Sequence, residues 1–185
     1  VDARVQPGAS VLLLGTGGVS IWGLQLAKAA GLRAIITSSS DDKLARAKAL
    51  GADATINYRA TPQWQDEVRR LTDGRGVDAV LEVGGQGTLQ RSIDAAAIGG
   101  AISIIGGVSG FGGDFNPFSL ITGVKRLSGI FVGSRAMAED LSRFVAVNAI
   151  APVVDRVFAF DQARQAYEHL QSGAHFGKVV IEVAR

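Results

Sequence analysis

A glycine-rich turn is the part of this chain whose residue types and spacing could do the most chemistry. The turn follows the apolar residues 11–14 and precedes apolar residues at helical spacing, and it consists of Gly15, Thr16, Gly17, Gly18 and Val19. A strand, a tight glycine turn and a helix in this order let the backbone approach a pyrophosphate, since the helix N-terminus offers free N–H groups. The sixth position of the pattern holds Ser20 instead of glycine, and this small residue still allows close packing of helix on strand. The segment therefore predicts a dinucleotide-phosphate site, with a purely structural turn as the alternative.

Small hydroxyl residues end the second expected strand, residues 34–37, where a dinucleotide fold selects its nucleotide. An acidic residue there binds the ribose hydroxyls and repels a 2′-phosphate. Here Ser38 and Ser39 occupy that point, and Lys43 follows one turn into the next helix. Hydroxyls and an ammonium suit a 2′-phosphate, so these residues favour NADP(H) over NAD(H). Two alternatives stay open: Asp41 reaches the ribose after a shift of one turn, or the serines and aspartates simply cap the helix.

Glycines also follow the fourth and fifth expected strands. Gly84 comes after the fourth, and Gly106 and Gly107 come after Ile105 at the end of the fifth. Ligands of open α/β sheets bind at the carboxyl ends of strands, where glycines let a cofactor approach the backbone. Any one of these glycines is explained more simply as a tight turn between strand and helix.

Strand and helix patterns alternate over most of the chain and would position these residues. The expected strands are 11–14, 34–37, 54–58, 77–83, 101–105 and 127–132, and the expected helices are 19–30, 41–50, 61–71, 88–97, 118–123 and 136–149. Short, mostly β-branched strands separated by helices are typical of a parallel sheet with both faces covered. We therefore expect the α/β class, with a doubly wound, six-stranded Rossmann sheet in the order 3-2-1-4-5-6.

The C-terminal part of the chain differs in character. Residues 1–150 form the expected nucleotide-binding domain, and residues 151–185 show a strand, a helix and a strand at 156–160, 161–170 and 178–183. This short extension either lengthens the sheet or belongs to another domain. Because the chain opens without methionine, we expect it to be a piece of a longer polypeptide.

Composition narrows the classes of function. The 185 residues are 47% hydrophobic and carry a formal net charge of +2, with basic residues scattered among acids, so we expect no nucleic-acid surface. Apolar stretches fall short of the roughly 20 residues of a membrane span, and no signal peptide precedes the first strand, so we expect a cytoplasmic protein. The chain has no cysteine, and His169 and His175 have no nearby cysteine or paired acid in sequence, which favours packing or surface roles over metal binding.

Several motifs, taken in order, resemble the cofactor-binding half of medium-chain zinc-type alcohol dehydrogenases and quinone oxidoreductases. They span nearly the whole chain: Val5-Gln6-Pro7-Gly8, Gly15-Thr16-Gly17-Gly18-Val19, Ala27-Lys28-Ala29-Ala30-Gly31, Lys48-Ala49-Leu50-Gly51-Ala52-Asp53, Ile56-Asn57-Tyr58, Gly74-Arg75-Gly76-Val77-Asp78, Glu82-Val83-Gly84-Gly85 and Gly177-Lys178-Val179-Val180-Ile181. The resemblance implies an oxidoreductase that moves a hydride between NADP(H) and an alcohol, aldehyde, ketone or quinone.

The resemblance also implies roles for single residues. It places Gly17, Gly18 and Val19 beside the pyrophosphate and Ser38, Lys43 and Tyr58 beside the 2′-phosphate. It places Ile105, Gly106 and Gly107 beside the nicotinamide ribose, and Phe131, Val132 and Gly133 beside the nicotinamide. It implies a homodimer through the sixth strand, residues 127–132. It also makes residues 151–185 the return segment of a largely absent, GroES-like substrate domain. That domain would hold the small-molecule substrate and any zinc, so this chain alone should bind cofactor but not catalyse, with no catalytic or metal-binding residue of its own.

Two other functions compete with this interpretation. A non-catalytic NADP-binding or redox-sensing module would show the same glycine-rich turn, and its C-terminal extension would pack on its own sheet. A methyltransferase also uses such a turn, but it normally needs an acid where this chain has Ser38.

Overall fold

The computed structural model describes residues 5–183, so residues 1–4 and 184–185, at the outer ends of the two expected domains, lie outside the described residues. Its centre is a six-stranded sheet in the order β3-β2-β1-β4-β5-β6, with every neighbouring pair parallel. The strands are β1 (Ser10–Leu13), β2 (Arg33–Ser38), β3 (Ala54–Asn57), β4 (Val77–Glu82), β5 (Ala96–Ile104) and β6 (Arg126–Gly129). The predicted Rossmann sheet and its strand order are confirmed.

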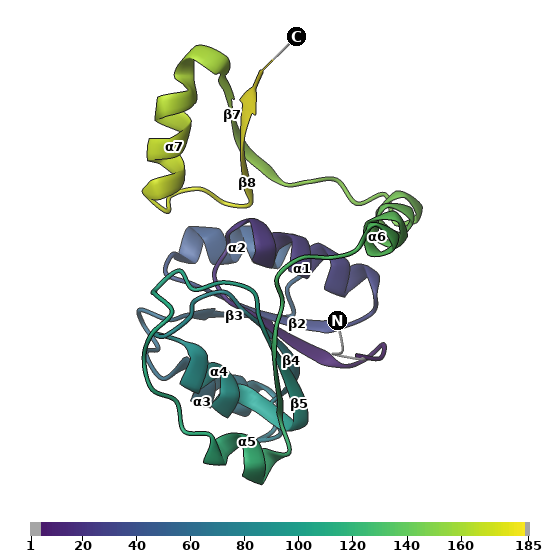
Figure 1. Ribbon diagram of the computed structural model, residues 1–185, viewed down its shortest axis with the longest axis vertical. Helices are drawn as coiled ribbons and strands as arrows, with labels where there is room; N and C mark the ends of the chain where they lie inside the picture. The colour runs from purple at the N-terminus through teal and green to yellow at the C-terminus, as the bar shows by residue number, and fades with distance from the viewer. Residues whose placement is uncertain (1–4, 184–185) are drawn as a thin grey trace.

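Helices cover both faces of the sheet (Figure 1). The helices α1 (Gly18–Ala29) and α2 (Asp41–Ala49) lie on one face, and α3 (Trp64–Leu71), α4 (Leu89–Ala95) and α5 (Phe118–Gly123) lie on the other. The central strand β1 is buried along its whole length, with side chains alternating between two apolar clusters on opposite faces. An uninterrupted apolar run is what a strand covered on both sides requires.

The ends of the last two strands of the sheet differ from expectation. Strand β5 begins at Ala96, not at residue 101, and the preceding helix stops at Ala95. Strand β6 ends at Gly129, not at residue 132. Both ends follow from pairing: Ala96 at the start of β5 pairs with Val77 of β4, and Gly129 at the end of β6 pairs with Ile104, the last residue of β5. Phe131 therefore lies beyond the sheet.

The C-terminal extension forms a separate unit. The helix α6 (Arg135–Val147) leads to β7 (Val154–Ala159), a 3₁₀ turn (Phe160–Gln162), α7 (Ala163–Gln171) and β8 (Lys178–Glu182). Because β7 and β8 pair with each other in a two-stranded parallel sheet, the idea that this segment lengthens the main sheet is wrong. The unit lies over α1 and α2 (Figure 1), and its Phe176 is 1% exposed within the apolar cluster on that face.

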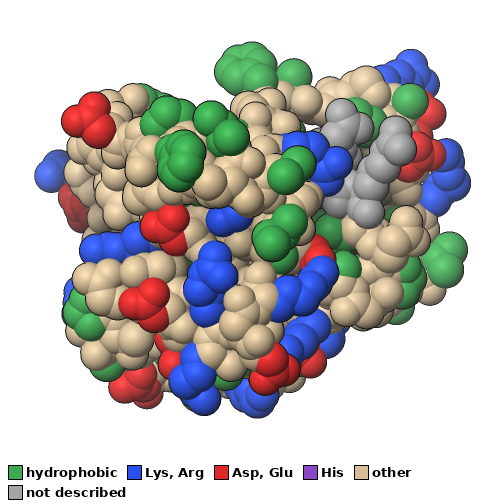
Figure 2. Space-filling view, turned by 90° about the horizontal axis from the view of Figure 1, so that it is seen from below, with side chains coloured by type: hydrophobic (Ala, Val, Ile, Leu, Met, Phe, Trp, Pro, Cys, Tyr) green, Lys and Arg blue, Asp and Glu red, His purple; other side chains and the backbone are tan. Residues whose placement is uncertain are grey.

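The lower face of the molecule in Figure 1 carries charges of both signs. Figure 2 shows this face, where Lys and Arg side chains are interspersed with Asp and Glu and with separate hydrophobic side chains. Within residues 5–183, no helix is long and apolar enough to cross a membrane.

Val124 ends α5 in a conformation that suits glycine better. Its φ of 49° is left-handed, which a β-branched residue adopts at a cost, and its side chain is 71% exposed, so little packing is lost by removing it. We expect Val124→Gly to raise the free energy of unfolding by about 1 kcal/mol, measured by thermal denaturation. Val124→Ala keeps a Cβ and should gain less. A lower melting temperature for the glycine variant would contradict this explanation.

Asp78 ties β1 to β4 and should make the fold sensitive to acid. Its carboxylate accepts hydrogen bonds from the Ser10 N–H at 2.8 Å and the Ser10 hydroxyl at 2.9 Å, and it forms an ion pair with Arg75. The Arg75 hydrogen bonds, with those from Ser10, outweigh burial and lower the Asp78 pKa from 3.8 to about 2. This stabilisation is present above pH 3.8 and is lost as the pH falls towards 2.

We expect Asp78→Asn to be less stable than the parent at pH 7 and to lose less of its remaining stability between pH 4 and pH 2. Urea unfolding at a series of pH values measures both effects. An unchanged acid transition in the variant would show that other carboxylates determine it.

Candidate functional site

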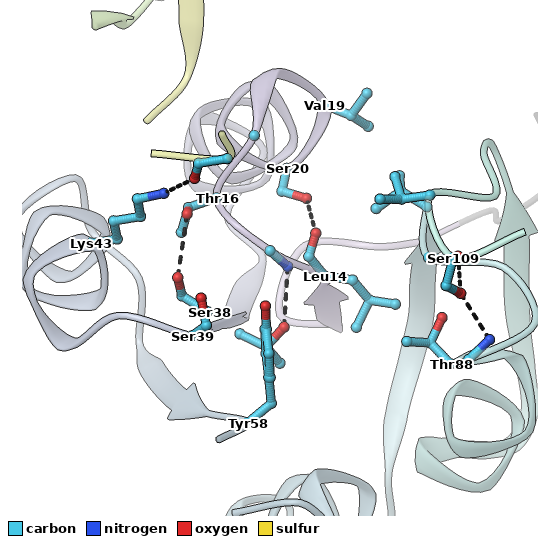
Figure 3. Close-up of a pocket in the computed structure, with 18 of the residues that line it drawn as sticks. Leu14, Thr16, Val19, Ser20, Ser38, Ser39, Lys43, Tyr58, Thr88 and Ser109 are labelled. Atoms are coloured by element: carbon cyan, nitrogen blue, oxygen red, sulfur yellow. Dashed lines mark hydrogen bonds between the residues drawn. The ribbon is translucent and has the colours of Figure 1, made fainter. Parts of the chain in front are cut away.

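A cavity of about 660 Å³ opens at the carboxyl ends of β1, β2 and β4. Figure 3 shows Lys43 and Ser38 on one side of it and Thr88 and Ser109 on the other. The predicted cofactor residues that line it are Gly15, Thr16, Gly17, Gly18, Val19, Ser38, Ser39, Lys43, Tyr58 and Gly84. The structure thus brings ten of the sequence-predicted residues to one cavity, although their binding roles stay predictions.

The glycine-rich turn presents backbone donors to this cavity. Gly15 has a φ of 72°, which glycine adopts without strain, and its N–H donates to the Thr37 hydroxyl at 3.1 Å. Gly17 is the N-cap of α1 but supplies no side-chain acceptor, so the first N–H groups of this helix have no side-chain cap. A helix N-terminus in this state fits an anionic group.

Ser20 explains how the turn works without its third glycine. The residue is 2% exposed, and its hydroxyl donates to the Leu14 carbonyl at 2.5 Å, which links α1 directly to the end of the first strand. Figure 3 shows this bond between Ser20 of α1 and Leu14. A small hydroxyl side chain therefore keeps helix and strand close together.

The end of β2 supplies hydroxyls and one ammonium. Ser38 is 3% exposed, and its hydroxyl lies 3.4 Å from the Thr16 hydroxyl. The Lys43 ammonium donates to the Gly173 carbonyl at 2.5 Å, and burial lowers the Lys43 pKa despite the opposing charge of Asp155. Asp41, the alternative ribose ligand, does not line the cavity.

Asp41 is engaged elsewhere. Its carboxylate accepts a hydrogen bond from the Asn57 side-chain amide at 2.7 Å, which connects the start of α2 to the end of β3. Ser40, two residues after the end of β2, caps α2 because its hydroxyl accepts a hydrogen bond from the Lys43 N–H at 3.4 Å. The helix-cap interpretation therefore explains Ser40 and leaves Ser38 and Ser39 to line the cavity.

The charged side chains that line the cavity are of one sign. Lys43 and Arg91 are the lysine and arginine among its lining residues, and none of those residues is an aspartate or glutamate. Low-dielectric walls carrying charges of one sign attract an oppositely charged ligand. The cavity thus suits a ligand with several phosphates.

Glu82 holds the turn after β4 in place. Its side chain is 0% exposed, and its carboxylate accepts hydrogen bonds from the Gly84 N–H at 2.7 Å, the Gly85 N–H at 3.0 Å, the Thr88 hydroxyl at 2.6 Å and the Ser92 hydroxyl. Four donors offset the cost of burying this carboxylate. Since Gly84 and Thr88 line the cavity, Glu82 positions part of its wall.

The predicted nicotinamide end is not assembled against this cavity. Six predicted residues are absent from its lining: Ile105, Gly106, Gly107, Phe131, Val132 and Gly133. Phe131 is 97% exposed and Val132 is 77% exposed, because both follow the end of β6. In place of the three residues after β5, Val108 and Ser109 from the same loop line the cavity. The roles of the six residues stay predictions.

Sequence reasoning missed several lining residues. Thr88 and Arg91 occupy one face at the start of α4, a spacing that a helical projection could have revealed. Gly173 and His175 reach the cavity from the C-terminal segment, and no local pattern connects them to the glycine-rich turn.

His169 does have a paired acid, contrary to the sequence expectation. Its Nε2 lies 2.8 Å from the Asp155 carboxylate, which also pairs with Arg46 at 3.3 Å. Burial alone would raise the Asp155 pKa, but the hydrogen bonds from His169 and Arg46 hold it below its ordinary value. These contacts join the C-terminal unit to α2, and no group of three or more potential metal ligands occurs within residues 5–183.

Comparison with known proteins agrees with this architecture. A zinc-type alcohol dehydrogenase-like protein of Schizosaccharomyces pombe is 48% identical over 98% of this chain. The crystal structure of an NAD-dependent alcohol dehydrogenase is 39% identical, with a TM-score of 0.90 over 97% of this chain and 52% of its own. A crotonyl-CoA carboxylase/reductase, AntE, in complex with NADP is 28% identical, with a TM-score of 0.87 over 97% of this chain and 51% of its own.

The chain spans about half the length of the relatives it matches, including 54% of the yeast protein. It corresponds to the cofactor-binding half of medium-chain oxidoreductases. The sequence profile of the zinc-binding dehydrogenases matches residues 18–147, which run from the start of α1 to the end of α6. By sequence and by fold, this chain belongs to the zinc-binding dehydrogenase family.

Proposed function

We propose that this chain binds NADP(H) as the cofactor-binding part of an oxidoreductase that acts on an alcohol, aldehyde, ketone or quinone. The observation that carries the proposal is the end of β2, where Ser38 and Lys43 line a cavity whose lining has no carboxylate. A bound nicotinamide supplies the hydride chemistry, and the residues of this chain bind and orient it.

The fit of the cavity to a dinucleotide rests on its two best-defined parts. The uncapped N–H groups at the start of α1 would take the pyrophosphate, next to the side-chain-free backbone of Gly17 and Gly18. Ser38, Ser39 and Lys43 would surround the 2′-phosphate, with Tyr58, which is 41% exposed, beside them. Solved relatives include both an NAD-dependent enzyme and an NADP complex, so the two nucleotides are compared side by side.

Calorimetric titration with NADPH and with NADH tests the proposal directly. We expect NADPH to bind more tightly, because only NADPH carries the phosphate that Lys43 can pair with. Tighter binding of NADH would favour a ribose contact by Asp41 and reject the NADP assignment. Binding of neither nucleotide would reject the proposal for this chain.

We also propose the division of labour that the resemblance implies. Residues 1–150 act as the nucleotide-binding domain, and residues 151–185 act as a return segment of a GroES-like substrate domain. That domain holds the substrate and any zinc, so this chain alone should bind NADPH without turnover. The separate β7–β8 sheet supports this division. Turnover of an alcohol or quinone by the full-length protein would distinguish the enzyme from a non-catalytic NADP-binding module.

The sheet edge at β6 suggests a partner. Strand β6 is the last in the order and, within residues 5–183, has a neighbouring strand on one side only, and unpaired strand edges usually need covering. We propose a homodimer through residues 127–132 in the full-length, cytoplasmic protein. The Ile130 N–H donates to the Ile104 carbonyl, so by alternation the N–H of Gly129 faces the open edge. We expect Gly129→Pro to shift the full-length protein from dimer to monomer in sedimentation, and an unchanged dimer would contradict the pairing.

A further inference from the structure

The C-terminal segment 173–177 is docked onto the glycine-rich turn. The Gly177 N–H donates to the Thr16 carbonyl at 3.0 Å, and Gly177 forms a parallel bridge with Gly17. One residue earlier, Phe176 is 1% exposed, and the Arg46 guanidinium lies 4.1 Å from the centre of its ring. These contacts hold the backbone beside His175, so the imidazole stands in a defined place.

That place is the cavity wall above the turn. His175 lines the cavity, and its Nε2 lies 3.9 Å from the point where a Cβ on Gly17 would be. The imidazole therefore approaches the same backbone that the uncapped N–H groups of α1 follow. A group bound over these N–H groups would meet the Nε2 side of the ring.

The protonation of His175 is suited to donating a hydrogen bond there. Burial lowers the His175 pKa, and the charges of Lys43 and His169 lower it further, against the opposing charge of Asp155. The ring is therefore neutral at pH 7 and carries one hydrogen. Its Nδ1 is buried without a hydrogen-bond partner within residues 5–183, and a buried nitrogen without a partner is rarer as a donor than as an acceptor. This places the hydrogen on Nε2.

We propose that His175 donates this Nε2 hydrogen to a pyrophosphate oxygen of the bound dinucleotide, so that segment 173–177 forms one wall of the cofactor site. The inference rests on the proposed function. It gives two residues of the cavity lining different roles. Lys43 binds the 2′-phosphate, which only NADPH carries, whereas His175 binds the pyrophosphate, which NADPH and NADH share. His175 thus contributes to affinity without contributing to the choice of cofactor.

The test compares two substitutions in the whole chain by calorimetry. His175→Phe keeps a planar ring without a donor and should weaken NADPH and NADH by the same factor, about tenfold. His175→Gln offers an amide N–H and should recover most of the affinity. Thermal unfolding of both variants without nucleotide shows whether each is folded.

Imidazole NMR signals of the unaltered chain give a second readout that needs no variant. Adding NADPH or inorganic pyrophosphate should shift the His175 Nε2 resonance more than that of His169. The inference would be overturned if the Phe variant bound NADPH with unchanged affinity, or if the chemical shift of His175 Nε2 did not change on saturation with NADPH. A loss confined to NADPH would overturn it too, since it would assign His175 to the 2′-phosphate. If the unaltered chain binds neither nucleotide, the proposed function itself fails, and that titration shows it separately.

Discussion

Replacing Lys43 with methionine is expected to weaken NADPH binding by about 10- to 100-fold and to leave NADH binding nearly unchanged. A hydrogen bond between an ammonium and a phosphate contributes about 1.5–3 kcal/mol, and its loss applies only to the nucleotide that carries the 2′-phosphate. Methionine keeps the length and apolar stem of the side chain, so α2 should remain in place. Calorimetry with both nucleotides at one ionic strength measures the two affinities.

Lys48→Met is the matched control for this substitution. Lys48 lies on the same helix and carries the same charge, but it donates to the Asp53 carbonyl and does not line the cavity. Removing it should change both affinities only slightly, through the long-range field. An equal loss of NADPH and NADH affinity in the Lys43 variant would show that Lys43 acts through the structure of the site and not on the 2′-phosphate.

Replacing Glu82 with glutamine is expected to lower the free energy of unfolding by about 3 kcal/mol. The carboxylate is fully buried and accepts from four donors, and an amide would turn its N–H₂ group towards some of them. The turn carrying Gly84 and Thr88 would loosen, so NADPH affinity should fall as well. Urea denaturation and calorimetry on the same preparation measure the two effects.

Removing one donor at a time provides the comparison for Glu82. Thr88→Val and Ser92→Ala each leave the carboxylate with three donors, so each should cost only about 1 kcal/mol. If the glutamine variant is no less stable than these two, the buried charge is not what holds the turn.

The fold could be predicted because its signals are local and repeated. Strands such as β1 and β2 are uninterrupted apolar runs between clear turn residues, and such runs between helices specify a parallel sheet. The start of β5 and the end of β6 could not be predicted, because they depend on where the partner strand begins or ends. The position of the C-terminal extension could not be predicted either. It depends on the pairing of β7 with β8, and α7 separates these two strands in the sequence.

The candidate site divides along the same line. Gly17 and Ser38 could be predicted as site residues because each lies in a short sequence motif that a few neighbouring residues define. Gly173 and His175 reach the cavity only through tertiary contacts, and the pairing of His169 with Asp155 joins residues from separate elements. The sequence indicated which side chains could bind a phosphate, but only the structure shows which of them line the same cavity.

The burial of Phe176 affects the order in which this protein can fold during synthesis. Phe176 belongs to the same apolar cluster as Leu13 and Ile21, although it is translated after every strand of the main sheet. A nascent chain that has completed the sheet therefore still exposes the part of this apolar cluster that Phe176 covers as it leaves the ribosome. That side of the core closes only when the C-terminal segment emerges, and until then it is open to chaperones and to proteases.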